Sequence, residues 1–166
     1  MKKIIAAVAV LLLTATALLA QSSKSIYKKY SNEKGVSAVY ISPAMFSLIR
    51  HIPSVEMNDE DVDLSPVISS LTGMYILSCE NRMVADRLLN DVERLLDSGD
   101  FELLMEAKED GDLTRMFSLG DETTINSFVL LNIEPDEVNF IAFEGKIPRK
   151  AMEDIVAGSL QEEDDD

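Results

Sequence analysis

The order of helical and strand patterns is the feature that most constrains how this sequence can fold. Residues 82–97 carry apolar side chains at helical spacing, and residues 101–143 then hold four short apolar segments separated by turn signals. Consecutive strands joined by short turns pair as antiparallel neighbours, whereas a parallel sheet needs a helix between strands. The order therefore predicts an α+β single domain, with a five- to six-stranded, mostly antiparallel sheet and helices packed on one face.

The segment 82–97 is the clearest helix in the sequence. Asn81 is suited to cap its first turn, and Ser98-Gly99 is suited to end it. Its apolar positions form one stripe with a period of 3.6 residues: Val84, Ala85, Leu88, Leu89, Val92, Leu95 and Leu96. The residues expected to face water are Asp86, Arg87, Asn90, Asp91, Glu93, Arg94 and Asp97.

The other elements are assigned from the same periodicities. Before the long helix, the sequence predicts a short helix around 26–30, a strand over 36–41 and a helix from Ser42-Pro43 to Pro53. A polar acidic loop is expected over 54–65. A strand is expected over 74–79, and residues 69–73 lead into it. After the long helix, it predicts strands over 101–108, 113–119, 124–133 and 138–143. Gly145 is expected to close the strands. Pro148 is expected to open a last helix with Ala151, Met152, Ile155 and Val156 inward and Gly158 at its end.

Two of these strands are apolar on both faces. Residues 128–131 read Phe-Val-Leu-Leu, and residues 140–143 read Phe-Ile-Ala-Phe. Because successive side chains of a strand point to opposite faces, both faces of such a strand avoid water, so we expect the two strands in the middle of the sheet. The second face is then either covered by another element or used to bind something.

The first twenty residues have the layout of a secretory signal peptide. Lys2 and Lys3 precede a wholly apolar stretch, and small residues lead to Ala20, after which polar sequence begins. The residues 15–17, Ala-Thr-Ala, offer a second cleavage site, and a retained membrane anchor is the structural alternative. We therefore expect residues 1–20 to be a signal peptide, 21–158 to be the domain, and 159–166 to be an acidic disordered tail. The mature protein is expected to be exported to the periplasm or the cell exterior, soluble and without a transmembrane anchor.

Composition excludes several functions. The chain has 15 Lys and Arg against 30 Asp and Glu, and this formal charge of −15 argues against nucleic acid as a partner. One Cys and one His exclude disulfide frameworks and His-rich metal centres.

Cys79 is expected to be a buried residue of a strand, and His51 is expected to complement the negative end of a helix. Apart from Met1, the methionines are scattered and are expected to fill gaps in the core: Met45, Met57, Met74, Met83, Met105, Met116 and Met152.

Two charged segments invite functional hypotheses. Asp59, Asp61 and Asp63 have the spacing of a calcium-binding EF-hand loop, but Leu64 and Ser70 occupy the positions where such a loop needs Gly and Glu. We interpret the segment as a solvated loop, with an unspecialised cation site as the alternative.

Lysines gather near the start of the mature chain, where we expect them to aid solubility. Contact with anionic lipid or a partner is the alternative. These lysines are Lys24, Lys28, Lys29 and Lys34.

Most of residues 24–156 resemble a family of small exported proteins of Gram-negative, gut-type bacteria, the domain of unknown function DUF4252. The resembling segments are residues 27–31, 35–36, 39–46, 101–105, 132–137 and 143–147, among them Tyr-Ile-Ser-Pro-Ala-Met-Phe at 40–46 and Asn-Ile-Glu-Pro-Asp-Glu at 132–137. The resemblance implies a small exported α+β protein and supplies no activity or site residues. Many relatives are lipoproteins with a Cys at the cleavage site, and this sequence departs from that pattern.

The sequence contains no recognisable set of nucleophile, base and orienting residue, no phosphate-binding glycine loop and no G-x-S-x-G motif. We therefore assign no catalytic, cofactor-binding or metal-binding residue. The hypothesis that follows is a non-enzymatic binding or protein-interaction module of the cell envelope, whose partner is an envelope protein or an apolar ligand. The alternative is a small carboxylate-based enzyme or a cation-binding protein. A cavity with convergent carboxylates would favour the alternative, and a flat apolar sheet face would favour the first hypothesis.

Overall fold

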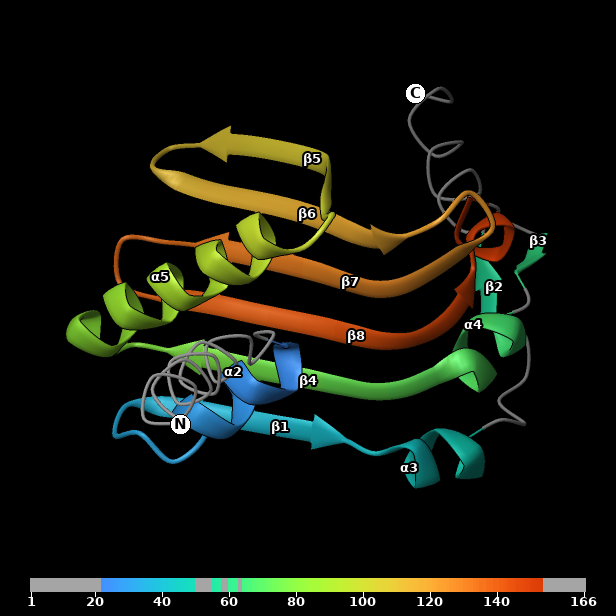
Figure 1. Ribbon diagram of the computed structural model, residues 1–166, viewed down its shortest axis with the longest axis horizontal. Helices are drawn as coiled ribbons and strands as arrows, with labels where there is room; N and C mark the ends of the chain where they lie inside the picture. The colour runs from blue at the N-terminus through green and yellow to red at the C-terminus, as the bar shows by residue number, and fades with distance from the viewer. Residues whose placement is uncertain (1–21, 50–54, 58–59, 63, 154–166) are drawn as a thin grey trace, which may run out of the picture.

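Six strands pair into one antiparallel sheet, and two helices cover one of its faces (Figure 1). This architecture is seen in a computed structural model that describes residues 22–49, 55–57, 60–62 and 64–153. The helices are α2 (Ser23–Tyr30), α3 (Pro43–Leu48), α4 (Ser65–Ser70) and α5 (Arg82–Ser98). The strands are β1 (Val36–Ile41), β2 (Val55–Met57), β3 (Glu60–Val62), β4 (Leu71–Cys79), β5 (Glu102–Glu109), β6 (Asp112–Gly120), β7 (Thr124–Ile133) and β8 (Val138–Pro148).

The strand order in the main sheet is β1-β4-β8-β7-β6-β5, and every neighbouring pair is antiparallel. Strands β5 to β8 form a meander in chain order, and β8 then pairs with β4. The α+β class and the single antiparallel sheet are therefore confirmed. The two strands predicted to be apolar on both faces are β7 and β8, which occupy the middle of the sheet as expected.

Local sequence signals account for the ends of several elements. The hydroxyl of Ser42 accepts a hydrogen bond from the Met45 amide, with Pro43 in the first turn of α3, as predicted. The Asn81 side chain caps α5 by accepting from the Val84 amide. Asp110 and Gly111 both have positive φ angles, and together they make the tight turn between β5 and β6.

The main core lies between the sheet and the helices α2 and α5. On this side, which we call the helix face, β4, β7 and β8 contribute every second residue, and most of these side chains are buried. The stripe predicted for α5 packs against them, since Leu88, Val92 and Leu95 belong to the same buried cluster. Figure 1 shows α2 and α5 lying in front of this face.

A second, smaller apolar cluster lies at one end of the opposite face. Phe46 of α3, together with Val67 and Ile68 of α4, packs on residues whose side chains point away from α5, among them Phe128 and Phe143. Met152 belongs to this cluster, and helical residues 149–153 follow β8 directly. The short helices therefore cover one end of the face that α2 and α5 leave uncovered.

Three expectations about local structure are wrong. The segment 54–65 contains a small hairpin, β2–β3, where we expected only a polar loop. Residues 65–70 form the unexpected helix α4, and β4 begins at Leu71, so residues 69–73 are not the approach to a strand that we predicted. Strand β8 continues past Gly145 to Pro148. Gly145 does not end the strand, because its role is spacing: a Cβ at this residue would lie 2.4 Å from the Ser70 carbonyl oxygen at the end of α4.

Several predictions concern residues outside the described ranges. They include the signal peptide of residues 1–20, His51, Ile155, Val156 and the acidic tail, and they stay predictions. Among the described residues, the longest helices are too short and too polar to cross a membrane.

Candidate functional site: the open sheet face

The face of the sheet opposite α2 and α5, which we call the open face, carries three rows of side chains that run in register across all six strands. The middle row is Val39, Ile76, Ile141, Leu130, Met116 and Met105. The polar row is Ser37, Ser78, Asn139, Asn132, Thr114 and Ala107. The aromatic row is Ile41, Met74, Phe143, Phe128, Ser118 and Glu102. At the usual spacing of strands, each row is about 24 Å long.

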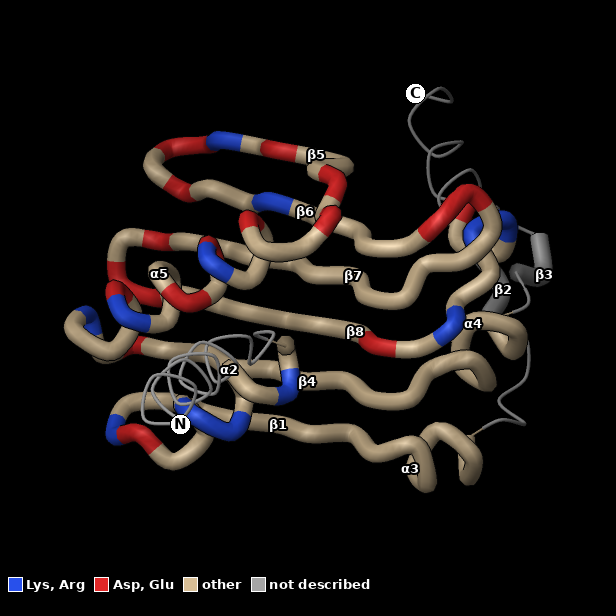
Figure 2. The backbone as a smooth tube through the Cα atoms, in the orientation of Figure 1, with Lys and Arg blue, Asp and Glu red and all other residues tan. Residues whose placement is uncertain are grey.

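The open face is almost uncharged although the chain is strongly acidic. Glu102, on the edge strand β5, is the only charged residue in the three rows. Figure 2 shows that acidic and basic residues gather on α5 and along the β5–β6 hairpin, while β1, β4 and β7 carry none. Strand β8 carries Glu144 and Lys146, and Glu144 is in register with Ser127 of the helix face. The three rows therefore form an almost uncharged strip on a protein of formal charge −15.

Exposure separates the two faces of the same strands. In β4, β7 and β8, most residues on the helix face are buried, while their neighbours in the middle row keep part of their surface in water. At the two edges of the middle row, Val39 is 48% exposed and Met105 is 40% exposed. The middle row is therefore an apolar surface that the described residues leave partly uncovered.

The polar row borders the middle row and is held in place by hydrogen bonds. Thr114 Oγ1 donates to Asn132 Oδ1 at 2.9 Å, and Asn132 Nδ2 donates to Glu134 Oε1 at 2.7 Å. The Ser78 hydroxyl donates to the Glu137 carboxylate. Between them, the side-chain amide of Asn139 makes no hydrogen bond with a described residue, so it can bond to a partner lying on the middle row.

On its other side, the middle row is bordered by the short helices. They cover the aromatic row, with Phe46 packed into the cluster that contains Phe128 and Phe143. Beside this cluster, Met45 and Leu48 of α3 form an apolar ridge and expose 48% and 78% of their surface, respectively. The uncovered strip is therefore bounded by an apolar helical ridge on one side and by fixed polar groups on the other.

A cavity of about 310 Å³ lies at the turn end of the sheet, next to the polar row. Five carboxylate residues and one arginine border it, namely Glu80, Asp86, Glu134, Asp136, Glu137 and Arg82. Glu134 and Glu137 already accept hydrogen bonds from Asn132 and Ser78. Among the described residues, no group of three or more Asp, Glu, His or Cys has a metal-binding arrangement. Ala85 and Leu89 of α5 place this cavity on the helix-face side, so only Glu134 and Glu137 give the polar row an acidic border. The carboxylates around the cavity do not converge on one point.

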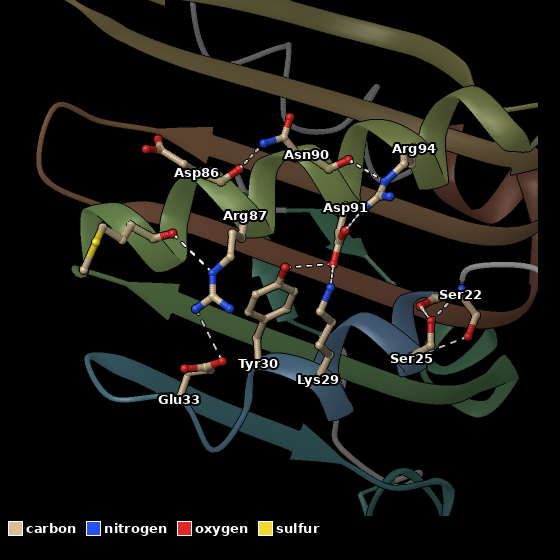
Figure 3. A network of polar contacts seen from close by, with 11 residues as sticks. Ser22, Ser25, Lys29, Tyr30, Glu33, Asp86, Arg87, Asn90, Asp91 and Arg94 are labelled. Carbon is tan, nitrogen blue, oxygen red and sulfur yellow. Dashed lines mark hydrogen bonds and ion pairs between the residues drawn. The ribbon is translucent and has the colours of Figure 1, made fainter.

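Asp91 is a charged residue that the helical pattern placed on the wrong side of α5. We expected it on the wet side of the long helix, yet it is only 2% exposed and lies between α5 and α2 (Figure 3). Lys29 Nζ donates to Asp91 Oδ2 at 2.5 Å, and Tyr30 Oη donates to the same oxygen at 2.7 Å. Arg94 pairs with the other carboxylate oxygen. The spacing 84, 88, 91 and 95 places Asp91 on the buried stripe and could have shown this.

The pKa values of Asp91 and Tyr30 shift in opposite directions. Burial raises the pKa of the Asp91 carboxyl, but the hydrogen bonds from Lys29, Tyr30 and Arg94 outweigh it, so the pKa lies below its usual value. Burial and the bond to Asp91 together raise the pKa of the Tyr30 phenol. Asp91 is therefore charged at neutral pH and joins α2 to α5, which is a structural role.

The structure also places other candidates from the sequence. Cys79 is fully buried in the main core, as predicted, and burial raises the pKa of its thiol, which disfavours the reactive thiolate. Lys29 is tied to Asp91, so it does not serve only to aid solubility. Three of the methionines that we expected in the core are exposed, and they are Met45, Met83 and Met105. His51, Asp59, Asp63 and the side chain of Asp61 lie outside the described residues, so the cation-site hypothesis stays untested.

The family model described as "Domain of unknown function (DUF4252)" matches residues 27–155. The chain belongs to this family. A comparison with curated proteins finds no match. The matched range begins in α2 and ends after β8, so the DUF4252 domain contains all six strands of the sheet and with them the whole open face.

Proposed function

We propose that this protein is a non-enzymatic interaction module whose open face binds another protein. The observation that carries the proposal is the middle row, which is apolar, uncharged and continuous across all six strands. An apolar strip rimmed by polar groups is the usual anatomy of a protein interface.

The form of the open face favours a protein over a small apolar molecule. Each of four hollows lined by described residues lies away from the middle row. A small ligand binds best in an enclosed pocket, whereas a surface about 24 Å long is matched by a protein. The acidic border at the turn end favours a partner that places Lys or Arg beside its own apolar surface.

Two methionines allow a matched test of this proposal. Met116 lies in the middle row, and Met83 is 78% exposed on α5, away from the open face. Lysine at position 116 would bury a charge in the interface, which weakens binding tenfold or more. Lysine at position 83 stays in water and leaves binding of the partner unchanged.

The measurement is the amount of partner that co-purifies with each variant after chemical crosslinking in cell envelopes, at equal folded protein. We expect Met116→Lys to lose the partner and Met83→Lys to keep it. If both variants retain the same amount of partner as the unsubstituted protein, the open face is not the interface. Added salt should weaken the interaction, because the acidic border contributes to it.

We also propose that the protein acts outside the cytoplasm after removal of residues 1–20. The support is the signal-peptide pattern of the sequence. Intact-mass analysis of envelope protein should give a chain that begins at Gln21. A mass that retains Met1 or Lys2 contradicts this location.

The alternative function, a cation-binding or carboxylate-based protein, is supported by the acidic cavity and by the spacing of Asp59, Asp61 and Asp63. A calcium site with a Kd near 10 µM would stabilise the domain by about 2.7 kcal/mol at 1 mM calcium. We expect no calcium-specific rise in the melting temperature. A rise of several degrees that is absent with magnesium and abolished by Asp61→Asn would make the alternative the better account.

A further inference from the structure

A second hollow lies on the helix face, between the beginning of α2 and the last turn of α5. Its volume is about 220 Å³, and Leu95 and Phe101 form apolar walls. Its floor is a row of the sheet in which Leu119, Ser127 and Glu144 are neighbours in register. This cavity is separated from the open face by the thickness of the sheet.

The cavity exists because this row has no large apolar side chain on its two central strands, β7 and β8. The neighbouring row on the helix face holds Phe117, Val129 and Ala142. Here the sequence places Ser127 beside Glu144, and Gly73 follows on β4. A Cβ at Gly73 would lie 3.0 Å from the hydroxyl oxygen of Tyr75, so the Tyr75 ring occupies that end of the row and the space over Ser127 stays open.

Ser127 is the first indication of a ligand. It is only 7% exposed, it borders the cavity, and its hydroxyl has no hydrogen-bond partner among the described residues. The other residues of β7 on the helix face, Val129 and Leu131, are apolar and buried. Because a buried hydroxyl without a partner is unfavourable, a molecule in the cavity that supplies a donor or an acceptor to Ser127 gains stability.

The charges around the cavity favour a cation. The Glu144 carboxylate lies directly across from Ser127 in the strand pair, and no described Lys or Arg pairs with it. Burial, together with the charge of Glu144, raises the pKa of the neighbouring Tyr75 to about 12. The cavity also borders the C-terminal end of the 17-residue helix α5, the negative pole of its dipole, and the last turn of α5 has no basic residue.

We propose that this cavity binds an ammonium group carried on a small apolar body. Glu144 pairs with the ammonium, one of its N–H groups donates to the Ser127 hydroxyl, and Leu95 and Phe101 contact the apolar part. Liquid water occupies about 30 Å³ per molecule, so the cavity has room for about seven waters, which suits a ligand of about that many non-hydrogen atoms. Carboxylates and phosphates are repelled by Glu144.

The ammonium group has two potential sources. One is a free small amine. The other is the chain itself, because cleavage after Ala20 would create an α-ammonium group on Gln21, next to Ser22, which borders the cavity. Both sources present the same chemistry, and the experiment separates them. The inference does not depend on the open face.

The first arm compares ligands of one size and three charges. Benzylammonium, benzyl alcohol and benzoate are added to the chain purified from envelopes, and binding is measured from NMR shifts and from the melting temperature. We expect benzylammonium alone to bind. Glu144→Gln and Ser127→Ala should each weaken it tenfold or more, whereas Glu93→Gln, on the exposed side of α5, should not. Ser127→Ala should fold well, because it removes an unpartnered hydroxyl.

The second arm measures how fast the α-amine of the purified chain is acylated near pH 7. If the chain's own amine fills the cavity, benzylammonium does not bind, acylation is slow, and Glu144→Gln accelerates it severalfold while Glu93→Gln does not. If Gln21 has cyclised, the α-amine is lost and benzylammonium must bind. Failure of benzylammonium to bind, together with an α-amine whose reactivity is unchanged by Glu144→Gln, overturns the proposal. Equal binding of benzoate also overturns it.

Discussion

Replacing the buried Asp91 by leucine should be among the most destabilising single changes at a polar residue of α5. The carboxylate is 2% exposed and accepts hydrogen bonds from three side chains. Of these donors, Lys29 is 55% exposed and Arg94 is 68% exposed, so both regain water when Asp91 is removed and contribute little to the cost. Tyr30 is fully buried, and its hydroxyl would lose its partner.

The magnitude follows from these contacts. A buried hydroxyl left without a partner costs about 1–3 kcal/mol, and a hydrogen bond to a charged group contributes about 1.5–3 kcal/mol. Since part of this is regained when leucine packs in the core, we expect Asp91→Leu to lower the free energy of unfolding by about 2–4 kcal/mol. On a domain of this size, this corresponds to a fall in melting temperature of several degrees.

The assay is equilibrium unfolding in urea, read from the midpoint at constant slope. Asp86→Leu on the exposed side of the same helix is the matched control, and we expect it to change stability by less than about 0.5 kcal/mol. Tyr30→Phe should cost less in the Asp91→Leu background than alone, because the orphaned hydroxyl is then absent. Equal midpoints for Asp91→Leu and Asp86→Leu would refute the reasoning.

The same contacts predict a dependence on pH. The pKa of Asp91 is lower in the folded protein than in the unfolded chain, whose usual value is about 3.9. Its stabilisation is therefore complete above about pH 4 and is lost as the pH falls through the folded-state pKa. We expect the stability difference between the unsubstituted protein and Asp91→Asn to shrink below pH 4. A difference that stays constant down to pH 2 contradicts the ionised state of Asp91.

Two further predictions concern the main core. Leu88→Ala and Leu95→Ala should each cost about 2–5 kcal/mol, because both side chains are buried between α5 and the sheet, and an unchanged urea midpoint for both would show that this stripe is not packed. Cys79 should resist thiol reagents in the native state and react once urea unfolds the domain, since its thiol is fully buried and its pKa is raised; rapid labelling without denaturant would contradict this.

The elements that sequence predicted well are those whose pattern is local. The stripe of α5, the strand β7 and the Asp110-Gly111 turn each depend on neighbouring residues, and the observed elements closely match the expected ranges. Within residues 101–108, Leu104 interrupts the alternation of apolar and polar side chains, and it lies where the register between β5 and β6 shifts, so the irregular pattern indicated a bulge.

The features that sequence missed depend on contacts between distant segments. Strand β8 extends past Gly145 because Ile147 and Pro148 still pair with Ile125 and Thr124 of β7. The helix α4 was overlooked although Ser65-Pro66 repeats the Ser42-Pro43 signal that had identified α3. Asp91 is buried only because Lys29 and Tyr30 meet it from a helix some sixty residues earlier in the chain.

The open face was foreseen only in part. The apolar pattern of residues 128–131 indicated that a second face would avoid water, and this left open whether another element covers it. The middle row could not be predicted, because it requires the order β1-β4-β8-β7-β6-β5 and the register of five strand pairs. The short helices pack on the aromatic row, so the first possibility, cover by another element, holds there, while the described residues leave the middle row partly uncovered.

Oxidation of methionine in the native chain tests the central claim most directly. Met105 and Met116 are partners in register on the open face, and Met83 is exposed on α5. Thioether oxidation follows exposure, and mass spectrometry can measure its rate at each residue in purified protein and in intact envelopes. We predict that Met105 and Met116 oxidise severalfold more slowly in envelopes than in the purified protein, while Met83 oxidises equally in both. Equal rates at all three residues in both settings would contradict a partner on the open face.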